Sequence, residues 1–96
     1  MTIHFTPASQ PAGKVADAEL HFTDGPLAGL KLIGFSIWER RRGVGRTVTF
    51  PARQYSVNGA DHRLALLRPC ATDSDHARLD LTDQILTAYA EQEAAS

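Results

Sequence analysis

The pattern that most constrains the fold is an alternation of apolar and polar side chains in the first half of the chain. From residue 16 to residue 23, apolar side chains alternate with Asp17, Glu19 and His21. This period of two is typical of a β-strand with one face against a core. The segment 30–40 alternates again with both faces partly apolar, as in a central strand. Together the two segments predict the middle of an antiparallel sheet.

Turn residues divide the next part of the chain into two further strands. Two glycines after residue 42 allow a tight reversal, so we expect a third strand over 46–55. Pro51 has no N–H group, which places this strand at a sheet edge or at a bulge. Asn58-Gly59 tolerates the positive φ values of a two-residue hairpin turn, and it predicts a returning fourth strand over 62–68.

The last quarter of the chain has the pattern of one amphipathic helix. Asp73, Ser74 and Asp75 offer N-capping side chains, and neither Gly nor Pro follows them up to residue 94. Apolar residues recur there at helical spacing and predict a face that covers the sheet. They are Ile85, Leu86 and Tyr89, with Leu79 or Leu81. The predicted fold is α+β, with a four-stranded antiparallel sheet of β-hairpins followed by one C-terminal α-helix.

Length and composition set the domain organisation and the compartment. A chain of 96 residues is one domain. Residues 1–13 show no sustained period, so we expect a flexible N-terminal leader, with a few extended residues near Ile3 to Phe5, and a single domain over 14–96. The single cysteine, Cys70, cannot form an intramolecular disulfide, and no apolar run is long enough to span a bilayer. These features predict a soluble cytoplasmic protein without a membrane partner.

The net charge of −1 hides a strong segregation of charge along the chain. Residues 31–68 carry eight basic and two acidic side chains, whereas residues 69–96 carry one basic and six acidic side chains. A basic block is the electrostatic signature of a nucleic-acid-binding surface, and an acidic block is typical of a solvated helix face. The sequence therefore directs attention to the middle of the chain.

The densest basic cluster is formed by Arg40, Arg41, Arg42 and Arg46, around the two glycines of the first predicted turn. Guanidinium groups on a protruding hairpin can reach phosphates. The alternatives are an ordinary solvated turn, gatekeeping of an edge strand, self-association, or pairing with the acidic helix.

Arg53 and Tyr55 are the second pair of candidate binding residues. Alternation puts them on one side of the predicted third strand with Thr47 and Thr49, where a phosphate contact and base stacking would combine. The alternative is a polar sheet face shielded by a tyrosine. Trp38 is also a potential stacking platform, but a tryptophan on a central strand favours the core or an interface.

The sequence gives no support for catalysis or for a cofactor. The four histidines are scattered, without carboxylates or cysteines at ligand spacing, so no metal site is predicted. The glycines at 43 and 45 lie between two predicted strands, and no helix N-terminus follows them to hold a phosphate. We expect a protein that is not an enzyme, with no cofactor and no small-molecule substrate.

Three phrases, in this order, resemble the SpoVG family of bacterial septation regulators. They are Gly-Leu-Lys-Leu-Ile-Gly-Phe-Ser-Ile at 29–37, Val-Thr-Phe-Pro-Ala-Arg at 48–53, and Asn58-Gly59 followed by Arg63 and a Leu-Arg-Pro close. The helical phrase Ile-Leu-Thr-Ala-Tyr at 85–89 is similar to the end of that family's helix. The resemblance covers roughly residues 14–90 and implies a small homodimeric bacterial regulator that binds nucleic acid. At residue 54 this chain has Gln where the family tends to have a second basic residue.

The leading hypothesis is accordingly a SpoVG-like, dimeric regulatory protein that contacts DNA or RNA through its central arginines. The alternative is a protein-interaction or self-assembly module whose basic hairpin meets an acidic partner. A third interpretation, a single-strand binder like the Whirly or PUR-repeat folds, rests on element order alone.

Overall fold

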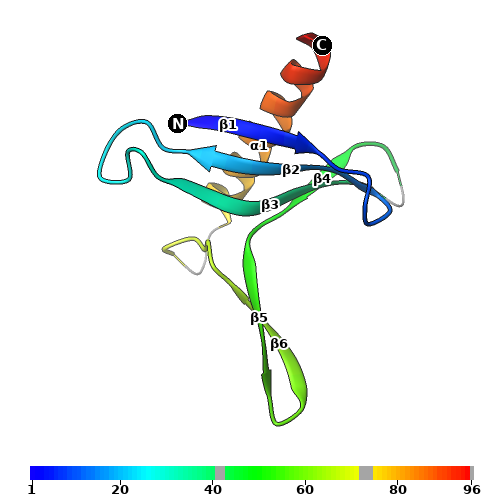
Figure 1. Cartoon of the computed structure of the whole chain (residues 1–96), viewed down its shortest axis with the longest axis vertical. Helices are drawn as coiled ribbons and strands as arrows, with labels where there is room; N and C mark the ends of the chain where they lie inside the picture. Colours follow the sequence, from blue (N-terminus) through cyan, green and yellow to red (C-terminus); the bar gives the residue numbers. More distant parts are fainter. Residues whose placement is uncertain (41–42, 72–74, 96) are drawn as a thin grey trace.

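The computed structural model describes residues 1–40, 43–71 and 75–95. These residues form six strands and one helix (Figure 1). In chain order the elements are β1 (Thr2–Pro7), β2 (Lys14–His21), β3 (Lys31–Glu39), β4 (Arg46–Thr49), β5 (Ala52–Val57), β6 (Ala60–Ala65) and α1 (His76–Ala95).

The first four strands form one antiparallel sheet in the order β1-β2-β3-β4, and α1 lies across one of its faces (Figure 1). The predicted α+β class is therefore confirmed: a four-stranded antiparallel sheet precedes a single C-terminal helix. The strands that make up this sheet differ from the predicted ones in two places, at β1 and at β5.

The first difference is β1, which lies within the segment that we expected to be a flexible leader. Residues Thr2 to Pro7 pair along their whole length with β2, from His21 to Ala16. Ile3 and Phe5 pack against the core, and these two apolar residues are too short a pattern to predict a strand by themselves. β1 depends on the neighbouring strand, which supplies both its hydrogen-bond partners and the apolar surface that its side chains cover.

The second difference is that the predicted third strand divides at Pro51. Its first part is β4, an edge strand of the sheet, and its second part is β5, which pairs only with β6. We call the β5–β6 hairpin, residues 52–65, the arm. Asn58 and Gly59 both have positive φ, at 52° and 78°, which confirms the predicted hairpin turn.

The arm projects away from the sheet and the helix (Figure 1). All but the first of its strand residues are exposed to solvent. The radius of gyration is 14.9 Å, whereas a compact domain of this length has one of about 12.5 Å. The arm is therefore a surface feature, and it contributes little to the core.

The core lies between the sheet and α1. Its buried residues are Ala16, Ala18, Leu20, Phe35, Ile37, Val48, Ile85 and Tyr89. The alternation in the sequence correctly predicts the β2 members, and helical spacing correctly predicts Ile85 and Tyr89. Leu81 packs against this core and Leu79 is exposed, which settles the choice between them.

The start of α1 agrees with its predicted cap only at Asp75, since Asp73 and Ser74 lie outside the described residues. The carbonyl oxygen of Asp75 accepts a hydrogen bond from the Leu79 amide at 2.9 Å, so Asp75 holds the N-cap position. At the other end of the helix, Tyr89 contacts the ring of Phe5 from β1, with ring centroids 5.1 Å apart. The helix thus closes one face of the sheet from its N-terminal cap to its last turns.

The opposite face of the sheet carries polar side chains that bond to one another. Glu19 accepts hydrogen bonds from Lys31 and pairs with His21, whose ring stacks on His4 with centroids 3.7 Å apart. The Trp38 indole N–H donates to Thr49 Oγ1 at 2.9 Å. Trp38 is half-buried on this face and is not part of the core.

Candidate nucleic-acid interface

Arg46, at the start of β4, is held by two carboxylates and one aromatic ring. Its guanidinium donates two hydrogen bonds to the Glu93 carboxylate, one of them 3.0 Å long, and another to Glu39 at 3.3 Å. It also lies 5.1 Å from the centroid of the Tyr89 ring. Arg46 therefore ties the end of α1 to the sheet, and its charge is neutralised within the molecule.

This ion pair shifts the pKa values of both partners. Hydrogen bonding from Arg46 holds the pKa of the exposed Glu93 carboxyl below its ordinary value, and the same contact raises the pKa of Arg46. Hydrogen bonding to His21, followed by the charge of Lys31, likewise lowers the pKa of Glu19. Folding therefore stabilises the anionic form of both carboxylates relative to the unfolded chain.

Stability should fall as the pH drops through the ordinary pKa of glutamate, because the unfolded chain then takes up protons that the folded chain resists. We expect Glu93→Gln to weaken this pH dependence of stability. The lowered pKa of Glu19 should account for part of the pH dependence that remains in this variant. Urea unfolding between about pH 3 and pH 7 measures it. Glu91→Gln is the matched control, since Glu91 lies on the same helix and makes no ion pair with the described residues. An identical pH profile for Glu93→Gln and wild type would contradict the role of the pair.

The remaining arginines of the first predicted cluster are only partly placed. Arg40 follows β3 directly, is exposed, and makes no ion pair with any described residue. Its amide donates a hydrogen bond to the Gly45 carbonyl at 3.2 Å, which closes the turn between β3 and β4. Arg41 and Arg42 lie outside the described residues. The turn therefore contributes one charge that the structure places, and Arg46 is engaged elsewhere.

Arg53 and Tyr55 lie on the arm, and both are exposed. Because the strand divides at Pro51, they do not share a sheet face with Thr47 and Thr49 as predicted. Alternation and pairing place them on one face of the arm with His62, whose ring stacks on that of Tyr55 with centroids 5.3 Å apart. We call this the aromatic face of the arm; it also carries Val57 and Leu64.

The other face of the arm presents a basic residue that was not among the predicted site residues. Arg63 pairs with Gln54 and so points to the side opposite Arg53. The Asn58-Gly59 turn fixes this register, so a two-residue hairpin drawn from the sequence would have placed Arg63 there. It counted only as part of the basic block.

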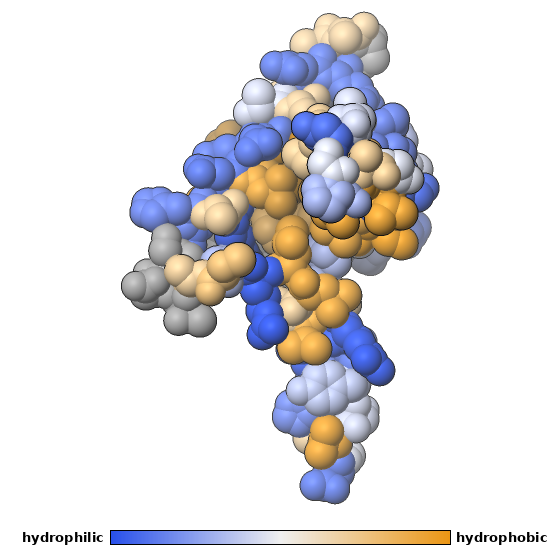
Figure 2. All heavy atoms as spheres, turned by 90° about the vertical axis from the view of Figure 1, so that its left-hand side faces the viewer, coloured by the Kyte–Doolittle hydropathy of each residue, from blue (hydrophilic) through white to orange (hydrophobic). Residues whose placement is uncertain are grey.

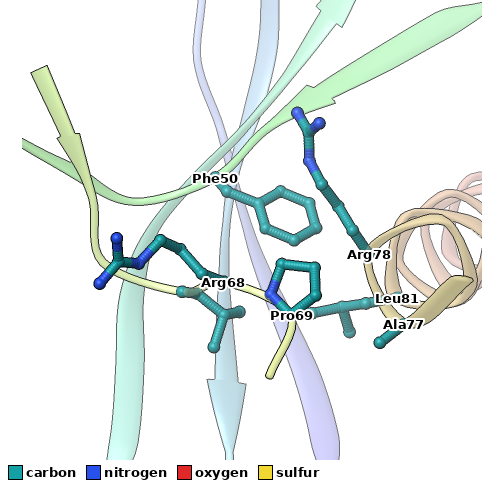
Figure 3. A pocket seen from close by; sticks show the side chains of 7 residues that line it. Phe50, Arg68, Pro69, Ala77, Arg78 and Leu81 are labelled. Atoms are coloured by element: carbon teal, nitrogen blue, oxygen red, sulfur yellow. The ribbon is translucent and has the colours of Figure 1, made fainter. Parts of the chain in front are cut away.

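A groove lies at the base of the arm, between β4, this second face and the first turns of α1. Its cavity has a volume of about 580 Å³ and opens onto a smaller apolar compartment of about 150 Å³. Figure 3 shows Phe50, Pro69 and Leu81 around the smaller compartment, with Ala77 and Arg78 presented by the helix. The Arg78 guanidinium lies 5.4 Å from the centroid of the Phe50 ring.

Three arginines line the groove from three different segments. Arg63 comes from β6, Arg68 from the segment after the arm and Arg78 from α1, and Asp75 is the acidic residue among the described residues of the lining. None of the three makes an ion pair with a described residue. Sequence reasoning missed Arg68 and Arg78 because no local pattern shows that the helix start packs beside the base of the arm.

The positive charge is therefore divided over two regions. One basic region is the turn that contains Arg40, which precedes β4. The other is the base of the arm, which follows β4, so the two regions lie at opposite ends of this strand (Figure 1). The first region keeps Arg40, and the second combines Arg53 with the three arginines of the groove. Of the predicted site residues that the structure describes, Arg53 and Tyr55 lie together on the arm, and Arg40 and Arg46 lie at the other end of β4.

Two negative findings concern the described residues alone. Within residues 1–40, 43–71 and 75–95, no cluster of three or more His, Cys, Asp or Glu side chains is arranged to hold a metal ion. The one helix of that part of the chain is not long and apolar enough to cross a membrane.

No protein-family model matches the sequence, and neither the curated proteins nor the solved structures contain a match.

Proposed function

We propose that this chain is a SpoVG-like, non-enzymatic regulatory protein of the bacterial cytoplasm that binds DNA or RNA through the arm. The observation that carries the proposal is the exposed Arg53, which stands on a protruding two-stranded ribbon without a carboxylate partner among the described residues. An unpaired guanidinium of this kind keeps its full charge for a phosphate.

The shape and chemistry of the arm support this use. A two-stranded β-ribbon has the dimensions that the major groove of duplex DNA admits, which is about 12 Å wide. The stacked rings of Tyr55 and His62 add a flat surface next to Arg53, on which an unpaired base could stack. The combination suits a polyanion that carries aromatic bases.

Some of the residues behind the family resemblance also fall on this part of the molecule. Phe-Pro-Ala-Arg at 50–53, Asn58-Gly59 and Arg63 belong to the arm and its base. We extend the proposed interface to Arg40, a second contact at the far end of β4, and we keep Arg41 and Arg42, which lie outside the described residues, as candidate binding residues. Arg46 is left out of the interface because Glu93 and Glu39 occupy its guanidinium.

Binding to single- and double-stranded DNA and RNA across a salt series tests the proposal. We expect Arg53→Ala to weaken binding roughly fivefold at low salt, and to reduce the slope of log Kd against log salt by roughly 0.7 to 0.9, since one phosphate contact is lost. Arg63→Ala tests the opposite face of the same ribbon. Lys31→Ala is the control, since it removes one positive charge far from the arm.

The three variants distinguish a specific contact by the arm from a general effect of net charge. Equal losses for Arg53→Ala and Lys31→Ala would mean that net charge alone acts, and would remove the arm from the interface. Absence of binding at low salt for every nucleic acid would end the proposal altogether.

A second candidate function, self-assembly, is favoured by the apolar surface of the arm and its surroundings. Figure 2 shows apolar side chains gathered from the body of the molecule down onto the base of the arm. Exposed apolar residues of this region are Ile33, Tyr55, Val57, Leu64 and Leu66. An isolated two-stranded hairpin is marginally stable in water, so a second copy packed on the arm would stabilise it.

Light scattering tests this second candidate. We expect a homodimer, and we expect Leu64→Glu together with Leu66→Glu to shift the mass to that of a monomer, because charged groups would be buried in the contact. Leu79→Glu, on an exposed apolar residue of α1, is the control. A monomeric wild type at high concentration would exclude a stable dimer.

A further inference from the structure

We propose that the groove at the base of the arm holds one unpaired base of a single-stranded nucleic acid, with the flanking phosphates on the arginines of its rim. This inference deepens the proposed function and rests on it. It adds a separate subsite that selects single strands over duplexes. None of the predicted site residues that the structure describes lines this subsite.

The cavity has two parts with different chemistry. Phe50, Leu67, Pro69 and Leu81 give the smaller compartment an apolar lining, and it shares Arg68 and Arg78 with the larger groove. The larger of the two parts has a volume of about 580 Å³, which lies within the range of ligand-binding clefts. An occupant needs an apolar part for the inner compartment and an anionic part for the rim.

The charge of the rim identifies the second part of the occupant. Among the described residues that line the groove, three arginines stand against one aspartate, an excess of two positive charges. None of these guanidinium groups is neutralised by a described carboxylate, so desolvated anionic groups can bind them directly. Figure 3 shows the Arg68 and Arg78 side chains pointing in different directions from the apolar compartment. Each of these two guanidinium groups can contact one of the two phosphates that flank a base.

The apolar compartment favours a base over other apolar groups. The Phe50 ring and the Arg78 guanidinium, both flat, lie 5.4 Å apart and border the same space. Aromatic rings and guanidinium planes are the surfaces on which proteins stack unpaired bases. A base in a duplex is already stacked and paired, so only a single strand can supply one without an unstacking cost.

Position also links the groove to the arm. Ala52, Arg63 and Ala65 line the groove from the second face of the arm, so a strand that contacts this second face also contacts the groove. An acidic peptide with an apolar side chain would satisfy the same charge pattern, although it does not need flat surfaces. It therefore enters the test as a competitor.

The experiment compares two single-stranded probes with the same phosphates. One is an oligothymidine of about 12 nucleotides, and the other is an abasic oligonucleotide of equal length. We expect the wild-type protein to prefer the base-bearing probe at least about fivefold, as one stacked base provides. Ala77→Leu should lower this preference about fivefold, to what stacking on Tyr55 and His62 provides, because Ala77 borders the inner compartment and the larger side chain fills it.

Two further variants separate the groove from the arm. Arg78→Ala should weaken the base-bearing probe more than the abasic one, since it removes both a phosphate contact and one of the two flat groups. Arg53→Ala should weaken both probes equally. Leucine is a good helix former, so Ala77→Leu keeps the helix, and an unchanged thermal unfolding midpoint confirms that this variant is folded.

Each result decides the inference. Equal binding of the two probes by the wild type, or a preference as large in Ala77→Leu as in the wild type, overturns the subsite and leaves the proposed function intact. Displacement of oligothymidine by an alternating glutamate–leucine peptide, lost in Ala77→Leu, assigns the groove to a protein partner and also overturns it. Failure of both probes to bind overturns the subsite, and it overturns the proposed function as well only when duplex DNA and RNA also fail to bind at low salt.

Discussion

Replacing Phe35 with alanine is expected to lower the free energy of unfolding by about 3 to 5 kcal/mol, the largest loss at any single side chain of the sheet. Phe35 is completely buried on β3, and its ring meets that of Phe50 edge-to-face with centroids 5.2 Å apart. The substitution removes this contact and leaves a cavity that the rigid sheet cannot close. For a chain of this size the loss is a large fraction of the whole stability.

Urea unfolding followed by circular dichroism measures the effect, and Ile33→Ala is the matched control. Ile33 lies on the same strand, two residues before Phe35, but it is 60% exposed. The control should change the free energy of unfolding by no more than about 0.5 kcal/mol. Similar losses for the two variants would mean that the core does not lie between the sheet and α1.

Replacing Gly34 with alanine is expected to cost roughly 2 to 6 kcal/mol, from two separate causes. Gly34 has a φ of +107°, a conformation that side-chain-bearing residues rarely adopt. A Cβ atom at this position would also lie 2.9 Å from Cβ of Pro51, which is too close for two carbon atoms. The backbone strain and the steric contact add to each other.

Gly45→Ala separates these two causes. Gly45 has a similar φ of +115°, but the nearest atom to an added Cβ is Nε of Arg40, at 4.0 Å. It should therefore lose only the strain energy, about 1 to 3 kcal/mol. Equal losses in thermal or urea unfolding of the two variants would show that Pro51 does not press on β3.

The contact between Gly34 and Pro51 also bears on the arm. Pro51 is the residue at which the chain leaves the sheet, and the Leu66 amide donates a hydrogen bond to its carbonyl at 3.0 Å. The base of the arm is thus packed against the one position of β3 that has no side chain. A larger residue at 34 would displace the base of the arm, and we expect Gly34→Ala to weaken nucleic-acid binding as well as stability.

Local patterns predicted the parts of the fold that depend on one segment at a time. The alternation at 16–22 sets which side of β2 faces the core, and Asn58-Gly59 sets the hairpin turn and the register of the arm. The helix is equally local, because its spacing of apolar residues identifies Ile85 and Tyr89. In each case the physical cause lies in a dihedral preference or in the period of one element.

The errors arose where one element depends on another. The strand character of residues 2–7 comes from pairing with β2, and tertiary packing decides that the two parts on either side of Pro51 pair with different strands, β3 and β6. Arg46 looked like a phosphate ligand because its partner, Glu93, is 47 residues away in the sequence. A single-sequence pattern contains no information on such pairings.

By itself, the sequence determined the α+β class, the hairpin turn of the arm, the core-facing side of β2 and the basic character of the middle block. These follow from backbone preferences and side-chain periods that act over a few residues. Tertiary structure alone decided that β4 and β5 belong to different sheets, that Arg46 binds Glu93 of α1, and that Arg63, Arg68 and Arg78 line one groove. Those outcomes depend on how segments distant in the chain pack together, and packing is a property of surfaces that do not exist until the chain has folded.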